Sequence, residues 1–299
     1  MSKIQADFSA YNRSITGLRW VARVLTLVGA ALVVLASALG RAEMPNRGMQ
    51  IILLISGFAS LIIASVLRVL ATRKSHKLEK LLADNVTALA LAEVFDLDEY
   101  APNSAISNNE ICKAGLIKDW SERYGSDLVR GRYKGCKFSF SDVDLQKRVD
   151  EKTSRGAIDT TYHNRFKGQW IILETNKDIV GELRLRERLR TELAKSNAET
   201  ENTQFNSKYQ IEASDVHGAF MVLTPHFMEA VMRADFLANG RTFMYFGGRQ
   251  VHIAIHNERN LFEPSRKERD IAEVQLRQRR EVKYITDILD IFLENKRLF

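Results

Sequence analysis

The sequence has few cysteines and none of the short motifs that mark common catalytic, nucleotide-binding or metal-binding sites. Two cysteines in 299 residues form at most one bridge, which excludes a small disulfide-stapled fold. The chain contains no GxxxxGK[ST], no GxGxxG after a predicted strand, no HExxH, no CxxC and no GxSxG. We therefore expect no catalytic residue, no cofactor and no bound metal. A hydrolase of unfamiliar type stays the weakest alternative.

Apolar and charged residues are both plentiful, at 45% and 27% of the chain, which excludes a disordered protein. The net charge of +7 is concentrated at one end of the chain. Residues 1–71 contain seven basic and two acidic residues, whereas the remaining 228 contain 37 basic and 35 acidic ones. Because the basic excess flanks apolar segments, it indicates membrane topology and not a surface for nucleic acid.

Two long uncharged runs lie near the start of the chain, at Val24–Gly40 and Met49–Leu67. A membrane-spanning helix needs about 20 apolar residues, so we predict two transmembrane helices at about 20–40 and 49–70. A signal peptide or a buried core helix is the alternative for the first run. The first run starts too deep in the chain for a short leader, and a second run follows closely, so both points favour a hairpin.

The charges that flank these runs predict their orientation. Lysine and arginine accumulate on the cytoplasmic side of membrane proteins, and they gather before the first run and after the second. We predict a two-pass protein of the inner (cytoplasmic) membrane with both termini in the cytoplasm. The residues of the second flank are also predicted to contact lipid headgroups: Arg68, Arg73, Lys74 and Lys77.

Small residues recur at a spacing of four in both runs. They are Ala36 and Gly40 in the first, and Ser56, Ser60 and Ala64 in the second. Small residues on one helix face let two backbones approach closely in lipid. We predict that these five residues pack helices together, either within the hairpin or between protomers.

The organisation predicted from the sequence has four parts: 1–71 with the hairpin, 72–109 as stalk helix and linker, 110–264 as a cytosolic domain, and 265–299 as an amphipathic helix. The fold class is α+β, with a β-rich, mainly antiparallel domain flanked by helices. Residues 72–95 favour the stalk helix and 97–109 a breaker segment. Further helices are predicted at 110–124, with Asn109 as N-cap, at 225–238 after Thr224, and at 266–296.

Strand-like segments are predicted to be joined by glycine turns. The expected turns are Lys134–Gly135, Lys167–Gly168 and Gly247–Gly248, the last of which closes a hairpin of 241–246 with 250–256. Residues 170–174, 208–215 and 219–223 are further predicted strands, and 182–194 is left open between strand and helix.

Two histidines and three aspartates are of residue types that bind metal ions. His252 and His256 share one strand face, which we interpret as solvated, and Asp142, Asp144 and Asp150 are interpreted as a charged turn after a strand.

Three segments together resemble a bacterial membrane-protein family, the domain-of-unknown-function 3137 family. They are DLVRGRYKGCKFSFSD at 127–142, NRFKGQWIILE at 164–174, and 204–264, which contains MVLTPHFMEAV, VHIAI and LFEP. The resemblance covers roughly residues 73–264. It implies transmembrane helices with a cytosolic domain and suggests a LemA-type membrane protein as a partner. It implies no particular activity.

These observations leave two main functional hypotheses. The first is a membrane-anchored interaction or scaffold module that self-associates, with partners limited to the lipid bilayer, its own copies and another membrane protein. The second is a sensor whose pocket binds a ligand and alters the packing of the two spans. A deep polar pocket would favour the sensor, and a filled core would weaken it.

Overall fold

The computed structural model describes residues 2–41, 47–152, 158–189, 195–263 and 271–299. The chain divides into two compact units, Met1–Ala83 and Asp84–Phe299. We call them the hairpin unit and the sheet unit and describe each by itself. The four-part division expected from the sequence stays a prediction.

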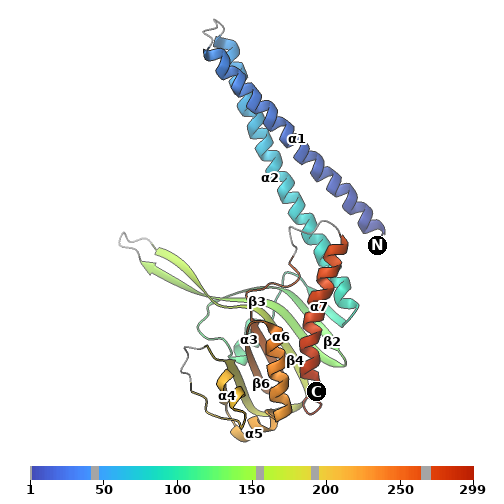
Figure 1. Cartoon of the computed structure of the whole chain (residues 1–299), viewed down its shortest axis with the longest axis vertical. Helices are drawn as coiled ribbons and strands as arrows, with labels where there is room; N and C mark the ends of the chain where they lie inside the picture. Colours follow the sequence, from blue (N-terminus) through green and yellow to red (C-terminus); the bar gives the residue numbers. More distant parts are fainter. Residues whose placement is uncertain (1, 42–46, 153–157, 190–194, 264–270) are drawn as a thin grey trace. The chain divides into compact units, whose positions relative to one another are not determined.

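The hairpin unit consists of helix α1 (Ser2–Arg41) and the first part of helix α2 (Arg47–Ala92) (Figure 1). Ser14–Leu39 and Arg47–Lys74 are long and apolar enough to cross a membrane, and only 17% and 11% of their most apolar windows are buried. A core helix of a soluble protein would be mostly buried. These two candidate membrane-spanning helices indicate a membrane protein. Helix α2 continues to Ala92, so most of the helix predicted over 72–95 is part of it, and its role as a stalk stays a prediction.

The sheet unit contains an antiparallel six-stranded sheet in the order β1-β2-β3-β4-β5, with β6 also paired to β4. Its strands are β1 (Asp96–Ala101), β2 (Glu122–Tyr133), β3 (Cys136–Lys152), β4 (Ile158–Glu187), β5 (Tyr209–Ala213) and β6 (Arg241–His256). Its other helices are α3 (Asn108–Ala114), α4 (Thr203–Lys208), α5 (Val216–Val222), α6 (Pro225–Ala238) and α7 (Ile271–Leu293). The predicted α+β class is confirmed.

Both faces of the sheet are covered, because successive side chains of a strand point to opposite faces. Ile171 and Leu173 of β4 belong to a large core shared with α5, α6 and α7. Trp170 and Ile172, which alternate with these residues along the strand, belong to a second core that includes Ile111 of α3. Figure 1 shows α6 and α7 side by side over one face of the sheet. The β3–β4 pair extends beyond the sheet as a two-stranded ribbon.

Several predicted boundaries were wrong, because strand pairing or helix capping determines them. The segment 97–109 begins as strand β1, which pairs with β2. Helix α3 is capped by Ser107 and not by Asn109, since Ser107 and Glu110 form a reciprocal capping box. It ends at Gly115, which has a positive φ of 59°, so the predicted helix over 110–124 is much too long. The predicted strand at 219–223 is part of helix α5, which Asp215 caps.

Two of the three predicted glycine turns were also wrong. Lys134–Gly135 does turn β2 into β3, with φ angles of 50° and 83°. Gly168, however, lies inside the continuous strand β4, where any Cβ would overlap the carbonyl oxygen of Ile255 on β6. Gly248 has a φ of 57° but lies in β6, which pairs with β4 on both sides of it. The extra residues are on β4 between Glu174 and Glu182, so the glycine pair marks a bulge and not a hairpin.

The apolar stripe of the C-terminal helix is buried against the rest of its own chain. Ile285, Ile288, Leu289 and Phe292 of α7 are almost fully buried in the large core, and the ring centroids of Phe292 and Phe227 on α6 are 6.0 Å apart. Residues 264–270, where the helix was predicted to start, lie outside the described residues. The stripe is therefore not available as an interface between protomers.

Candidate functional site

The hairpin unit brings some of the predicted packing residues to the contact between its two helices. Ala36 and Ala64 are buried, at 0% and 2% exposure, and the Ser60 hydroxyl donates across the pair to the carbonyl oxygen of Leu25 at 2.8 Å. Ser56 is exposed, and its hydroxyl donates within its own helix to the Leu53 carbonyl. Gly40 lies in α1, but its surroundings are outside the described residues. That these residues pack helices between protomers stays a prediction.

Helices α1 and α2 approach each other closely at Gly29 and Gly57, two glycines that do not belong to the small residues spaced by four. A Cβ on Gly29 would lie 2.9 Å from the Gly57 carbonyl oxygen, and one on Gly57 would lie 2.8 Å from Val33 Cγ2. Both belong to series spaced by seven and buried throughout, and these series are Ile15, Ala22, Gly29 and Ala36 in α1, and Gly57, Ala64 and Ala71 in α2. A seven-residue repeat is the period of a left-handed helix pair. We call these seven residues the hairpin seam.

The basic flank of the second span has more than one role. The Arg68 guanidinium donates to Thr26 Oγ1 on the other helix at 3.0 Å, and Thr26 donates to the carbonyl of Ala22. Arg73 and Lys74 are exposed, whereas the side chain of Lys77 is outside the described residues. Arg68 is thus partly engaged within the hairpin, and headgroup contact by the four residues stays a prediction.

In the sheet unit, the three segments that carry the family resemblance meet at one buried carboxylate. Asp142, the last residue of the first segment, is 4% exposed. One of its oxygens accepts from Gln169 Nε2 of the second segment at 3.1 Å, and the other accepts from the backbone N–H of Leu261 in the third at 2.7 Å. The same Gln169 amide donates to the carbonyl of Arg259 and accepts from Asn257 Nδ2. We call this arrangement the carboxylate knot.

The knot holds the segment 257–263, which follows strand β6. Phe262, next to Leu261, has a positive φ of 59°, which is strained for a residue with a Cβ. Its N–H donates to the Glu281 carboxylate of α7 at 2.6 Å, and Glu281 also pairs with Arg277 at 3.1 Å. Two carboxylates thus hold successive backbone N–H groups of the LFEP loop. The sequence interpretation of Asp142 as part of a charged turn was wrong, because β3 continues through it with both faces covered.

Burial governs the protonation of these acids. Desolvation raises the pKa of Asp142 well above its ordinary value, the hydrogen bond from Gln169 opposes this, and the nearby Asp127 adds to it. Desolvation likewise raises the pKa of Glu281, which Arg277 opposes. Asp127 itself accepts a hydrogen bond from the Tyr100 hydroxyl at 2.8 Å. Burial thus raises the pKa of both acids that hold the backbone N–H groups of Leu261 and Phe262.

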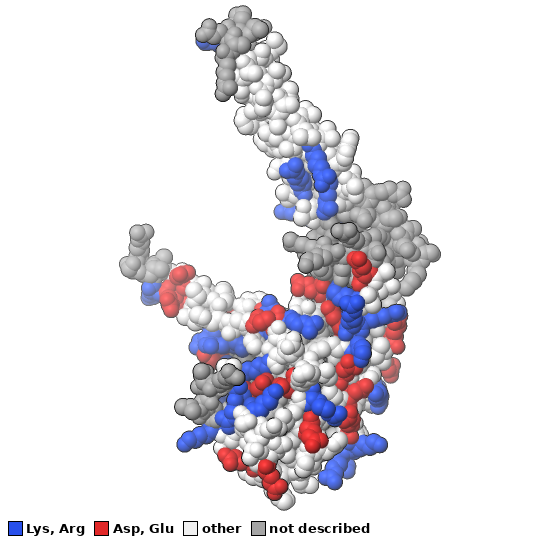
Figure 2. Space-filling model, in the orientation of Figure 1, with Lys and Arg blue, Asp and Glu red and all other residues white. Residues whose placement is uncertain are grey.

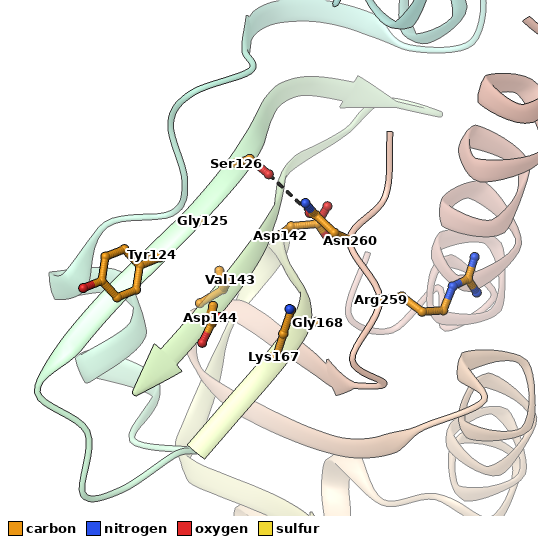
Figure 3. A pocket seen from close by; sticks show the side chains of 10 residues that line it. All are labelled: Tyr124, Gly125, Ser126, Asp142, Val143, Asp144, Lys167, Gly168, Arg259 and Asn260. Atoms are coloured by element: carbon orange, nitrogen blue, oxygen red, sulfur yellow. Dashed lines mark hydrogen bonds between the residues drawn. The ribbon is translucent and has the colours of Figure 1, made fainter. Parts of the chain in front are cut away.

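Beside the knot lies an open pocket of about 290 Å³ (Figure 3). Ser126 donates to Asn260 across it at 3.3 Å. Tyr124 and Arg259 point away from its middle in opposite directions, and the Arg259 guanidinium lies over the ring of Tyr284 at 5.4 Å. The residues that line it are Tyr124, Gly125, Ser126, Asp142, Val143, Asp144, Lys167, Gly168, Arg259 and Asn260. Ligand sites usually start at about 300 Å³ and are more enclosed.

His252 was interpreted as a solvated residue, and this was wrong. It is 0% exposed because α3 and the preceding loop cover the sheet face that the sequence pattern assigned to solvent. Its Nδ1 accepts from Trp170 Nε1 at 3.3 Å, and burial lowers its pKa to about 4. His256 is half-buried, and its Nδ1 accepts from the Lys167 N–H. Within the residues that the structure describes, no three His, Cys, Asp or Glu side chains form a metal-binding group.

Comparison with known proteins supports the family resemblance. The model of a family described as "Protein of unknown function (DUF3137)" covers the last two of the three segments. The DUF3137 family model matches residues 161–293. The resemblance to this family, predicted from the sequence, is confirmed. The match lies outside the hairpin unit and outside the first of the three segments. The matched residues include Gln169, Leu261 and Glu281, but not Asp142.

No curated protein matches the chain. One solved structure, the mycobacterial trehalose monomycolate transport factor A, aligns with 70% of this chain and 95% of its own, at 14% identity and a TM-score of 0.32. A structural similarity this low indicates neither a shared fold nor a shared function.

Proposed function

We propose that this protein is a membrane-anchored, non-catalytic interaction module of the inner membrane, in which α1 and α2 span the bilayer and the sheet unit binds partners in the cytoplasm. The observation that carries the anchoring is the outer surface of the hairpin. Large apolar side chains face away from the hairpin seam, such as Leu27, Ile52 and Ile55 at 72%, 67% and 65% exposure. Figure 2 shows few charges along the described part of the hairpin on the face in view. Lipid suits such a surface, and water does not.

The interaction role rests on the sheet unit. Both faces of its sheet are filled by packed side chains, and the polar groups of the carboxylate knot are used to hold a loop in place. The loop places Asn260 at the rim of an open pocket, a shape that suits a side chain of a partner protein better than an enclosed small molecule. Self-association and a LemA-type membrane partner belong to the same proposal.

Ligand sensing is the second candidate, and the pocket beside the knot is the observation in its favour. The pocket is lined by ionisable groups of both signs, Lys167 and Asp144 among them. Its openness and size favour the interaction module.

The proposed topology predicts which positions a reagent outside the cell reaches. In a background of Cys112→Ser and Cys136→Ser, a cysteine at Asn46 should react with a membrane-impermeant maleimide in intact cells. A cysteine at Asn257, in the sheet unit, should react only after the membrane is permeabilised. Labelling of Asn257→Cys but not Asn46→Cys in intact cells would reverse the assignment.

A further inference from the structure

Two apolar surfaces are used for packing within the chain itself. The hairpin seam joins α1 to α2 of the same chain, and the stripe of α7 is buried against its own sheet. An apolar surface remains on the outer side of α6 and α7. Phe236 of α6 is 85% exposed, more than any other large apolar side chain among the described residues, and its neighbour Leu237 is 40% exposed.

A hollow lies directly beside the protruding ring. It has a volume of about 440 Å³ and is lined by Met232, Arg233, Phe236, Leu237 and Ile291. Apart from Arg233, these side chains are apolar. Arg233 forms an ion pair with Glu294 of the C-terminal end, and the two side chains are 52% and 44% exposed. The surface thus combines an aromatic projection, an apolar hollow and one charge of each sign.

We infer that a second copy of this chain covers the α6–α7 surface, with Phe236 of each protomer inserted into the hollow of the other. A two-fold interface must be self-complementary, because each residue meets the counterpart of the residue that it contacts. A projection beside a hollow meets that requirement.

Arg233 and Glu294, the two charged residues beside the hollow, are compatible with a two-fold symmetric interface. A copy turned by 180° can bring Glu294 of one protomer towards Arg233 of the other, so that opposite charges face each other. A strongly basic or acidic partner would instead meet one like charge at this rim. A buried aromatic anchor surrounded by polar groups is also the usual composition of the centre of a protein interface.

Membrane anchoring would assist this contact. Two chains held in one bilayer have a raised effective concentration, so a surface of modest size suffices for association. In this respect the inference rests on the proposed function, although the contact itself lies entirely within the sheet unit.

The test uses the full chain in nanodiscs and in two mild detergents. The wild type should have twice the protein mass of the 34.1 kDa chain, and Phe236→Glu should reduce it to that of one chain. The matched control is Leu276→Glu on α7, because Leu276 is also apolar and 54% exposed but does not line the hollow. It should keep the wild-type mass. Since Phe236 is exposed within its own chain, Phe236→Glu should stay folded as a monomer and keep a cooperative thermal transition, lowered only by the loss of the dimer contact.

Cross-linking provides an independent readout. In the background without Cys112 and Cys136, Phe236→Cys should give covalent dimers with a short bismaleimide at several times the yield of Leu276→Cys. A monomeric wild type, an unchanged mass of Phe236→Glu, equal cross-linking yields, or cross-links to other proteins only would each overturn the inference. The topology labelling reports on the membrane anchor separately, so the failure of one proposal is distinguishable from that of the other.

Discussion

Replacing Asp142 with alanine is expected to lower the free energy of unfolding of the sheet unit by about 2–6 kcal/mol. The change leaves the Leu261 N–H and the Gln169 amide without their buried acceptor, and each unsatisfied buried donor costs about 1–3 kcal/mol. Chemical unfolding of the full chain in detergent, followed by the fluorescence of the buried Trp170, measures the loss. Asp144→Ala is the control, since Asp144 lies two residues along the same strand and its carboxylate accepts from the side chain of Gln146, a neighbour in the same strand.

The Asp142 carboxylate also predicts a pH dependence. Burial raises the folded-state pKa of Asp142 above its ordinary value of 3.8. The stability that this group contributes is therefore fully present below the ordinary pKa and is lost as the pH rises through the raised one. Glu281 acts in the same direction. Asp142→Asn should make the melting temperature fall less steeply with rising pH than in the wild type. An unchanged slope would mean that Asp142 is ionised throughout, contrary to this account.

Replacing Gly57 with leucine should open the hairpin seam. The new side chain would collide with Val33 and with the Gly29 backbone, and overpacking of this kind costs about 1–3 kcal/mol. Ala22 and Ala64 lie one heptad from the glycine contact on the two antiparallel helices. Cysteines at both positions should therefore form a disulfide within one chain when the purified protein is treated with copper phenanthroline as the oxidant. Gly57→Leu should reduce its yield several-fold.

Gly17→Leu is the control for this change. Gly17 lies in the same helix pair, and no atom lies within 4 Å of the position of its Cβ. The disulfide yield should therefore match that of the unmodified seam. Equal disulfide yields in the Gly57→Leu and Gly17→Leu variants would show that Gly29 and Gly57 are not in contact.

The sequence predicted the elements whose signals are local. Long uncharged runs revealed α1 and α2, and Thr224 followed by Pro225 revealed the start of α6. Ser107 and Glu110 are an equally local signal, because together they form a capping box that marks the start of α3 more specifically than Asn109 does. The repeat of small residues at intervals of seven could likewise have revealed Gly29 and Gly57, but the interval of four drew attention to Ser56 instead.

The rest depended on contacts between distant parts of the chain. A glycine pair in a strand has the same sequence whether it turns back or bulges, and only the pairing with β4 decides that Gly248 bulges. The burial of His252 required α3 to lie over the second face of the sheet, which the alternation within β6 does not reveal. Asp142 lies between Ser141 and Val143 in the sequence, and its partners Gln169 and Leu261 are 27 and 119 residues away.

The central claim, that the apolar outer surface of the hairpin faces lipid, is tested most directly by two cysteines of equal exposure. Ile55 on α2 is 65% exposed and Ile158 in the sheet unit is 66% exposed, so both would react alike in water. In open membrane fragments of the variants that lack Cys112 and Cys136, a water-soluble maleimide should label Ile158→Cys rapidly and leave Ile55→Cys unlabelled until detergent is added. Equal labelling of both positions before detergent would show that the hairpin is in water and would contradict the account.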